Sequence, residues 1–117
     1  MNVEIKKKWL EALESGEYQK GKDSLKTENK FCCLGVLCDI YIKETGKGKW
    51  KKLIAHAYSH FMEEEIEEAT VLPESVMVWA ELKDNNPSIN NDYHSITALN
   101  DASETFEDVI EAIKKEF

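Results

Sequence analysis

The most apolar stretch of the chain, residues 31–42, carries a single charged side chain, Asp39, although 32% of all residues are charged. The stretch is too long for a typical strand, too short to span a bilayer, and free of proline. It predicts a strand end at 31–32 that leads into a helix over residues 33–44. Because this helix is apolar on nearly every side, we expect it to be buried at the centre of the molecule. Gly35 within it predicts that another element packs closely against the missing side chain.

Helical spacing of apolar residues predicts further helices around this central one. They cover residues 3–15, 73–82 and 96–102, and a last helix starts near 106. Ser95 is a suitable N-cap for the third of these helices, because its hydroxyl can accept a hydrogen bond from a free amide of the first turn.

The remaining segments predict short strands and loops. Residues 25–27 and 30–32 are expected to form a short hairpin, in which Asn29 is the residue most tolerant of a positive φ. Residues 50–61 fit both a helical face and an irregular strand, and the acidic run 63–68 indicates an exposed edge or a loop. The whole pattern predicts a single α+β domain over residues 1–117, with four to five helices around a small antiparallel sheet.

The formal net charge of −8 is distributed unevenly along the chain. Residues 1–52 contain twelve lysines and eight acidic residues, whereas residues 53–117 contain three lysines and fifteen acidic residues. A protein with this net charge lacks a generally basic surface, so we expect no duplex nucleic acid as a partner. The chain has no arginine, so any phosphate contact must come from lysine, which acts as a point charge.

The N-terminal segment is charged and lacks the apolar run of a signal peptide, and no segment reaches transmembrane length. We therefore expect a cytoplasmic protein without a membrane partner.

Three cysteines, Cys32, Cys33 and Cys38, lie within seven residues of one another. An odd, clustered set does not make a disulfide framework, so we interpret them as buried apolar side chains. The alternatives are a metal site, to which His56, His60 and His94 would add nitrogen ligands, and a reactive thiol. The cysteine spacing does not match a zinc site, and the apolar setting disfavours a thiolate.

Asp39 is unusual in an apolar helix. It is either the one position that faces solvent or a buried, hydrogen-bonded acid that holds a nearby loop, and we favour the second interpretation. No catalytic set of Ser/His/Asp, Cys/His or paired carboxylates is evident, so we assign no catalytic residue, no metal and no cofactor.

Two basic loops, residues 46–52 and the loop from Tyr18 to Lys22, and the helix corner at Asn100-Asp101 carry the candidate chemistry for ligand binding. Residues 46–52 combine glycine amides, four lysines and a tryptophan, which suits a nucleotide but lacks the spacing of a P-loop. The alternative is a flexible basic loop with its tryptophan anchored in the core, and the residues at the helix corner can equally act as caps. The candidate ligand-binding residues are Tyr18, Lys22, Lys26, Lys49, Trp50, Asn100 and Asp101.

These residues lie within a pattern that resembles a family of small uncharacterised bacteriophage and prophage proteins. The likeness covers most of the chain and is weakest over residues 49–71. Members often carry glycine where Glu81 stands in this chain. The pattern consists of Trp9-x-x-Ala12-Leu13-x-Ser15-Gly16-x-Tyr18-x-x-Gly21 and Phe31-Cys32-Cys33-Leu34-Gly35-Val36-Leu37-Cys38-Asp39, continued by Leu72-Pro73, Val76, Trp79, Leu82, Asn86-Pro87, Leu99-Asn100-Asp101 and Thr105-Phe106.

The resemblance implies a phage accessory protein that acts inside a bacterial host, and it brings no established activity with it. We expect a non-enzymatic protein that binds and sequesters a small nucleotide-derived defence signal, with homo-oligomerisation as a way to complete the pocket. One alternative is a protein-interaction module that inhibits a host protein through the acidic second half. Another is an enzyme that degrades such a signal.

Overall fold

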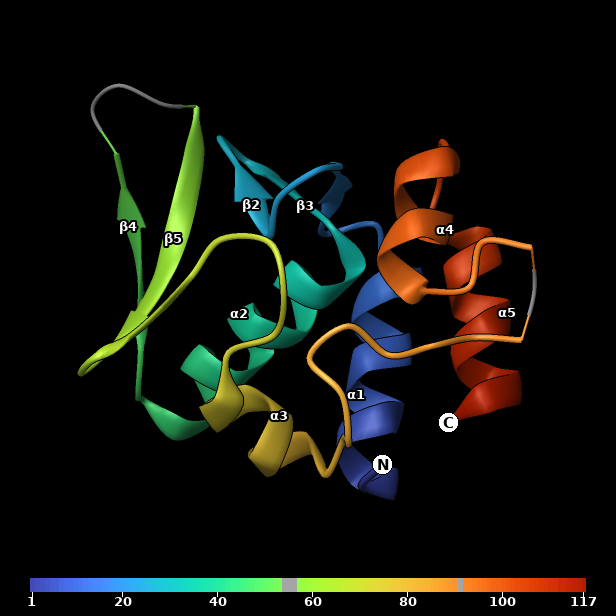
Figure 1. Cartoon of the computed structure of the whole chain (residues 1–117), viewed down its shortest axis with the longest axis horizontal. Coiled ribbons are helices and arrows are strands. Elements are labelled where there is room, and N and C mark those ends of the chain that lie inside the picture. Colours follow the sequence, from blue (N-terminus) through green and yellow to red (C-terminus); the bar gives the residue numbers. More distant parts are fainter. Residues whose placement is uncertain (54–56, 91) are drawn as a thin grey trace.

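The computed structural model describes residues 1–53, 57–90 and 92–117 and confirms the α+β class (Figure 1). The helices of this part of the chain are α1 (Val3–Glu14), α2 (Cys33–Thr45), α3 (Glu74–Ala80), α4 (Ile96–Ala102) and α5 (Glu107–Glu116). The strands are β1 (Gln19–Lys20), β2 (Lys26–Thr27), β3 (Lys30–Phe31), β4 (Lys49–Lys52), β5 (Tyr58–Glu63) and β6 (Ile66–Glu68). No helix of these residues is long and apolar enough to cross a membrane.

The sheet has the strand order β1-β3-β2-β5-β4, with β6 paired to β5 beyond the end of β2. All of these pairs are antiparallel except β1–β3, which is parallel and places Lys20 beside Phe31. The predicted small antiparallel sheet is thus extended by one short parallel pair. In Figure 1 the sheet lies on one side of α2, and α1, α4 and α5 lie on the other.

The segment for which the sequence left helix and strand open is a β-hairpin in its described parts. Trp50 in β4 is directly opposite Phe61 in β5, and their rings meet edge to face with 6.1 Å between centroids. Phe61 is fully buried, so this aromatic pair fixes the register of the hairpin against the core. The acidic run that follows turns at Glu64, which has a φ of 54°, and returns as β6.

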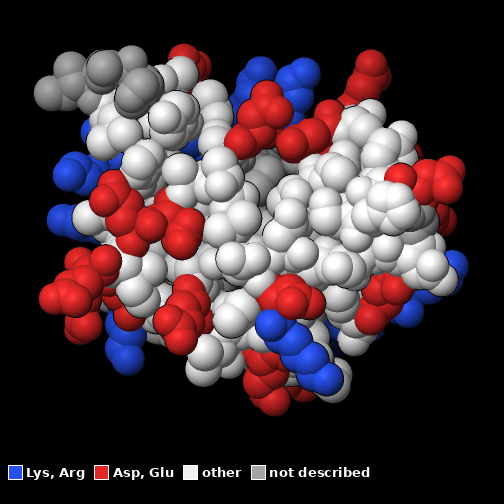
Figure 2. All heavy atoms as spheres, viewed as in Figure 1, with Lys and Arg blue, Asp and Glu red and all other residues white. Residues whose placement is uncertain are grey.

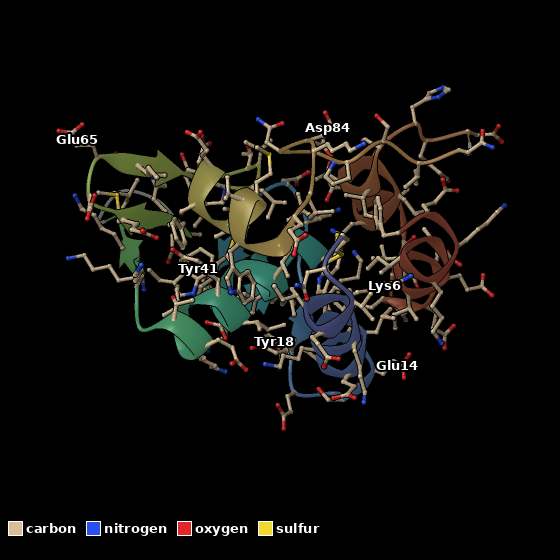
Figure 3. The ribbon with its side chains drawn as sticks, turned by 90° about the horizontal axis from the view of Figure 1, so that it is seen from below. Lys6, Glu14, Tyr18, Tyr41, Glu65 and Asp84 are labelled. Carbon is tan, nitrogen blue, oxygen red and sulfur yellow. The ribbon has the colours of Figure 1, made fainter. Side chains whose placement is uncertain are left out.

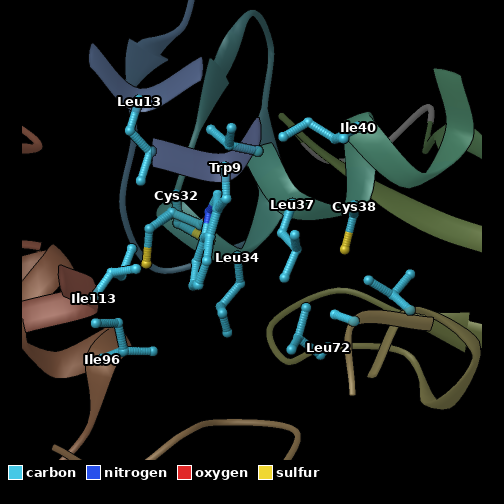
Figure 4. Packing of buried hydrophobic residues seen from close by; sticks show 14 of the residues in the cluster. Trp9, Leu13, Cys32, Leu34, Leu37, Cys38, Ile40, Leu72, Ile96 and Ile113 are labelled. Atoms are coloured by element: carbon cyan, nitrogen blue, oxygen red, sulfur yellow. The ribbon is translucent and has the colours of Figure 1, made fainter. Parts of the chain in front are cut away.

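Helix α2 is the central element, as predicted, and eight of its residues from Cys33 to Tyr41 are buried. Figure 4 shows Trp9 of α1 beside Cys32 and Leu34, with Ile96 and Ile113 closing the same core from α4 and α5. The Trp9 indole is fully buried and donates its N–H to the carbonyl of Cys33 at 2.9 Å. A buried indole needs such a partner, so this bond fixes α1 against the first turn of α2.

Gly35 marks the closest approach of two backbones in the core. A Cβ at this position would lie 1.8 Å from the carbonyl oxygen of Leu25. That carbonyl also accepts the amide hydrogen of Cys32 at 3.1 Å, so it has little freedom to move. The loop before β2 therefore lies directly on the α2 backbone, as the glycine predicted.

Two turns differ from the simplest expectation. In the β2–β3 hairpin the residue with positive φ is Glu28, at 54°, and not Asn29, the residue type that tolerates it best. Glu28 donates its amide to the carbonyl of Ala57 at 2.9 Å, which favours this conformation despite the side chain. Glu81, where the resembling phage proteins often carry glycine, ends α3 with a φ of 57°.

We predict that Gly35→Ala destabilises the protein by at least about 3 kcal/mol, because the new methyl group meets a fixed backbone carbonyl. Urea unfolding followed by tryptophan fluorescence measures this loss. Gly16→Ala is the matched control: its Cβ meets nothing within 4 Å, and only its φ of 81° is unfavourable, at a cost of about 1 kcal/mol. Equal losses for the two variants would contradict the close approach.

Candidate functional site

The structure separates most of the predicted ligand-binding residues into two groups. Tyr18, Lys26 and Trp50 surround Asp39 and Phe31 on the sheet side of α2. Lys22, Asn100 and Asp101 belong to a second group near α4. Lys49 precedes Trp50 in β4 but lines a separate hollow of about 500 Å³ with Gly48 and Met62.

Asp39 is the centre of the first group. Its carboxylate accepts hydrogen bonds from the Tyr18 hydroxyl at 2.6 Å and from the Trp50 indole at 3.0 Å. The Lys43 ammonium lies 3.1 Å from the same carboxylate and donates to the Tyr18 oxygen at 3.2 Å. Figure 3 shows Tyr18 beside α1 and α2. Asp39 is therefore the hydrogen-bonded acid that the sequence predicted, and it holds the loop before β1 and strand β4 to the central helix.

The surroundings of Asp39 favour its ionised form. Partial burial by itself would raise the pKa of this carboxyl, but the hydrogen bonds from Tyr18, Trp50 and Lys43 outweigh it and hold the pKa below its usual value. Burial and the hydrogen bond to Asp39 raise the pKa of the Tyr18 hydroxyl. The bonds to Tyr18 and Asp39 raise the pKa of Lys43. At neutral pH the group is thus an ionised carboxylate surrounded by three donors.

Lys26 and Trp50 already have partners within the first group. The Lys26 ammonium lies over the rings of Phe31, at 5.3 Å, and Trp50, at 5.7 Å. The Trp50 ring also meets Phe31 edge to face at 6.0 Å. These contacts join β2, β3 and β4 on one face, so both residues have a structural role, and their role toward a ligand stays a prediction.

Asn100 organises the second group from inside the core, where it is fully buried. Its carbonyl accepts the amide hydrogen of Cys33 at 3.1 Å, and its amide donates to the carbonyl of Gly21 at 3.1 Å and to Asp101 at 3.1 Å. The same Asp101 oxygen accepts the amide hydrogen of Asp23 at 3.1 Å. One buried side chain thus ties α4 to the first turn of α2 and to the loop after β1.

That loop and the end of α4 line an open pocket of about 900 Å³, which we name the lysine–carboxylate pocket. Figure 2 shows positive and negative side chains next to each other above a hollow between strands β2 and β3 and helix α4. The charged residues of the pocket are Lys20, Lys22, Lys30, Asp23, Asp101 and Glu104. Hydroxyl groups of Ser24, Thr27, Tyr58, Thr70 and Ser103 also line it.

Lys22 and Asp101 of this pocket were predicted from the sequence, whereas the other four charged residues were not. Lys20 and Lys30 come together through the parallel pairing of β1 with β3, in which Gln19 lies opposite Lys30. Strands of two residues carry no periodic signal, so this pairing could not be predicted. Glu104 enters the pocket only because Asn100 places the end of α4 beside the loop after β1.

The cysteines lie in the core, which supports their interpretation as buried apolar side chains. Burial raises the pKa of Cys32 to about 11 and raises the pKa values of Cys33 and Cys38 as well. The Cys32 sulfur accepts the amide hydrogen of Gly35 at 3.3 Å and acts as the N-cap of α2.

The histidines were considered as further metal ligands. His60 contacts Glu67 across β5 and β6 at 2.6 Å, and His56 lies outside the described residues. Among the described residues, no group of three or more His, Cys, Asp and Glu side chains could hold a metal ion.

The fold and the pocket thus define a small α+β domain with a charged pocket beside its central helix. Residues 1–117 match the model of a family described as a domain of unknown function (DUF8296), and the chain belongs to that family. No curated protein and no solved structure matches the chain significantly.

We predict that Asp39→Asn lowers the free energy of unfolding at pH 7 by about 1–3 kcal/mol, because the hydrogen bonds to a charged acceptor are weakened. Since the folded state lowers the pKa of Asp39, this stabilisation is complete above the unfolded pKa of about 3.9 and is lost as the pH falls through the folded value. The difference between wild type and variant should therefore narrow in acid.

Urea unfolding at pH 7 and near pH 3 measures this difference. Asp84→Asn is the control, because Asp84 is exposed in a loop. A difference for Asp39→Asn that does not change with pH would contradict an ionised Asp39.

Proposed function

We propose that this protein binds and sequesters a small nucleotide-derived signal in the lysine–carboxylate pocket. The observation that carries the proposal is the meeting of Lys20, Lys22 and Lys30 at one pocket of about 900 Å³. Ligand pockets of small molecules span roughly 300–1,000 Å³, so this volume suits a nucleotide or a cyclic dinucleotide. Several lysines at one site supply the point charges that a phosphate requires in a chain without arginine.

The hydroxyl groups in the pocket support the same class of ligand. Ser24 and Thr27 bond to each other through their hydroxyls at 2.6 Å, beside the lysines. Each hydroxyl both donates and accepts, so such a pair can serve phosphate and sugar oxygens. If the protein is related to the phage proteins that it resembles, the ligand is a defence signal of the bacterial host. Binding this signal without changing it chemically is sufficient to keep it from its receptor in the cytoplasm of an infected bacterium.

The acidic second half motivates a second candidate, inhibition of a host protein. Glu64, Glu65 and Glu67 are exposed on the β5–β6 hairpin, and Figure 3 shows Glu65 at its tip. A basic surface on a partner would complement this hairpin. Purification from the host separates the two candidates: a small molecule that co-purifies supports capture, whereas a stoichiometric protein partner supports inhibition.

We predict that isothermal titration with cyclic dinucleotides, cyclic trinucleotides and cyclic ADP-ribose isomers detects a ligand. Lys22→Ala should weaken its binding about tenfold to a hundredfold, because one charge-assisted contact is lost. Lys115→Ala, on the exposed face of α5 and outside the pocket, should leave the affinity unchanged.

Mass spectrometry of the ligand after incubation with the protein tests sequestration. If the protein only sequesters the ligand, the ligand is recovered intact. Absence of binding across the whole panel would refute the proposal, and a cleaved product would replace capture with catalysis. A native mass measurement with and without ligand tests the predicted homo-oligomer.

A further inference from the structure

We propose that the lysine–carboxylate pocket is bipolar and selects a ligand of low charge, with phosphate at the lysine side and hydroxyl or amino donors at the carboxylate side. This inference rests on the proposed function and adds the class of ligand. It excludes the most highly charged nucleotides, such as triphosphates, as preferred ligands.

The lysine side is formed by the loop after β1 and by β3. Lys20 is half-buried, and its ammonium lies 3.4 Å from the carbonyl of Gly21. Lys22 and Lys30 are exposed, so their ammonium groups can move toward a ligand. This side suits a phosphate, because three flexible point charges can adapt to its oxygens.

The carboxylate side is formed by the end of α4 and the residues after it. One oxygen of Asp101 accepts the amide hydrogens of Asp23 and Asn100, which fixes the carboxylate in place. Glu104 follows three residues later, beyond the end of α4, and is exposed. Ionised carboxylates only accept hydrogen bonds, so the part of a ligand that lies here must donate them. Ribose hydroxyls and the amino groups of bases are such donors.

The charged residues of the pocket balance in formal charge. Lys20, Lys22 and Lys30 carry three positive charges, and Asp23, Asp101 and Glu104 carry three negative charges. A triphosphate would bring its extra negative charge close to the carboxylates, and that repulsion opposes the attraction of the lysines. A nucleotide with one or two phosphates and free sugar hydroxyls can satisfy both sides at once.

Glu104→Gln separates the two ligand classes, because it removes one negative charge and leaves the lysines intact. We expect wild-type protein to bind cyclic ADP-ribose or cyclic di-AMP more tightly than ATP. In Glu104→Gln, cyclic ADP-ribose and cyclic di-AMP should bind about threefold to tenfold more weakly than they bind to wild type. ATP should bind more tightly to this variant than to wild type, by a similar factor.

The control is Glu111→Gln on the exposed face of α5, which makes the same charge change outside the pocket. Thermal unfolding of both variants checks that the fold is retained. Two results would contradict the bipolar pocket. One is tighter binding of ATP than of the cyclic nucleotides by wild type, and the other is a change of both affinities in the same direction in Glu104→Gln. Neither result contradicts nucleotide capture itself. Failure of every ligand to bind overturns both proposals.

Discussion

The first turn of α2 is buried, and its free backbone groups must find partners without water. Helix N-termini leave amide groups unpaired, and an unpaired buried amide is costly. Here the Asn100 side chain accepts from Cys33, and the Cys32 sulfur accepts from Gly35. The carbonyl of Cys33 in turn accepts from the Trp9 indole. Satisfying this one helix end brings together α1, α2 and α4, which are far apart in the sequence.

The same constraint shapes the pocket. Asn100 can cap α2 only if α4 lies beside the first turn of α2. This position of α4 also places Asp101 against the loop after β1. The remaining hydrogen bond of Asn100, to the carbonyl of Gly21, fixes the loop that carries the pocket lysines. The scaffold and the candidate site therefore share one buried side chain.

The sequence predicted the helices well because each has a local signal. An apolar run marks α2, and the Ser95 hydroxyl accepts the amide hydrogen of Ala98 at 3.3 Å, as expected of an N-cap. The sheet was harder to predict from the sequence, because β1, β2 and β3 have two residues each. Their pairing depends on contacts between residues that are far apart in the chain. The hairpin of β4 and β5 was ambiguous because lysines flank Trp50 and mask the alternation that its pairing with Phe61 would otherwise show.

For the candidate site, the residue types could be predicted but not their grouping. The sequence placed Tyr18 and Lys22 in one loop, and the structure directs Tyr18 to Asp39 and Lys22 to the pocket beside α4. Between these two residues the loop runs from the middle of α2 to its first turn. Asp39 thus joins the middle of the helix to the aromatic face of the sheet, and Asn100 joins the first turn of the helix to the pocket. The proposed site therefore lies beside the end of α2 that Asn100 caps, while the contacts around Asp39 hold the sheet to the middle of the helix.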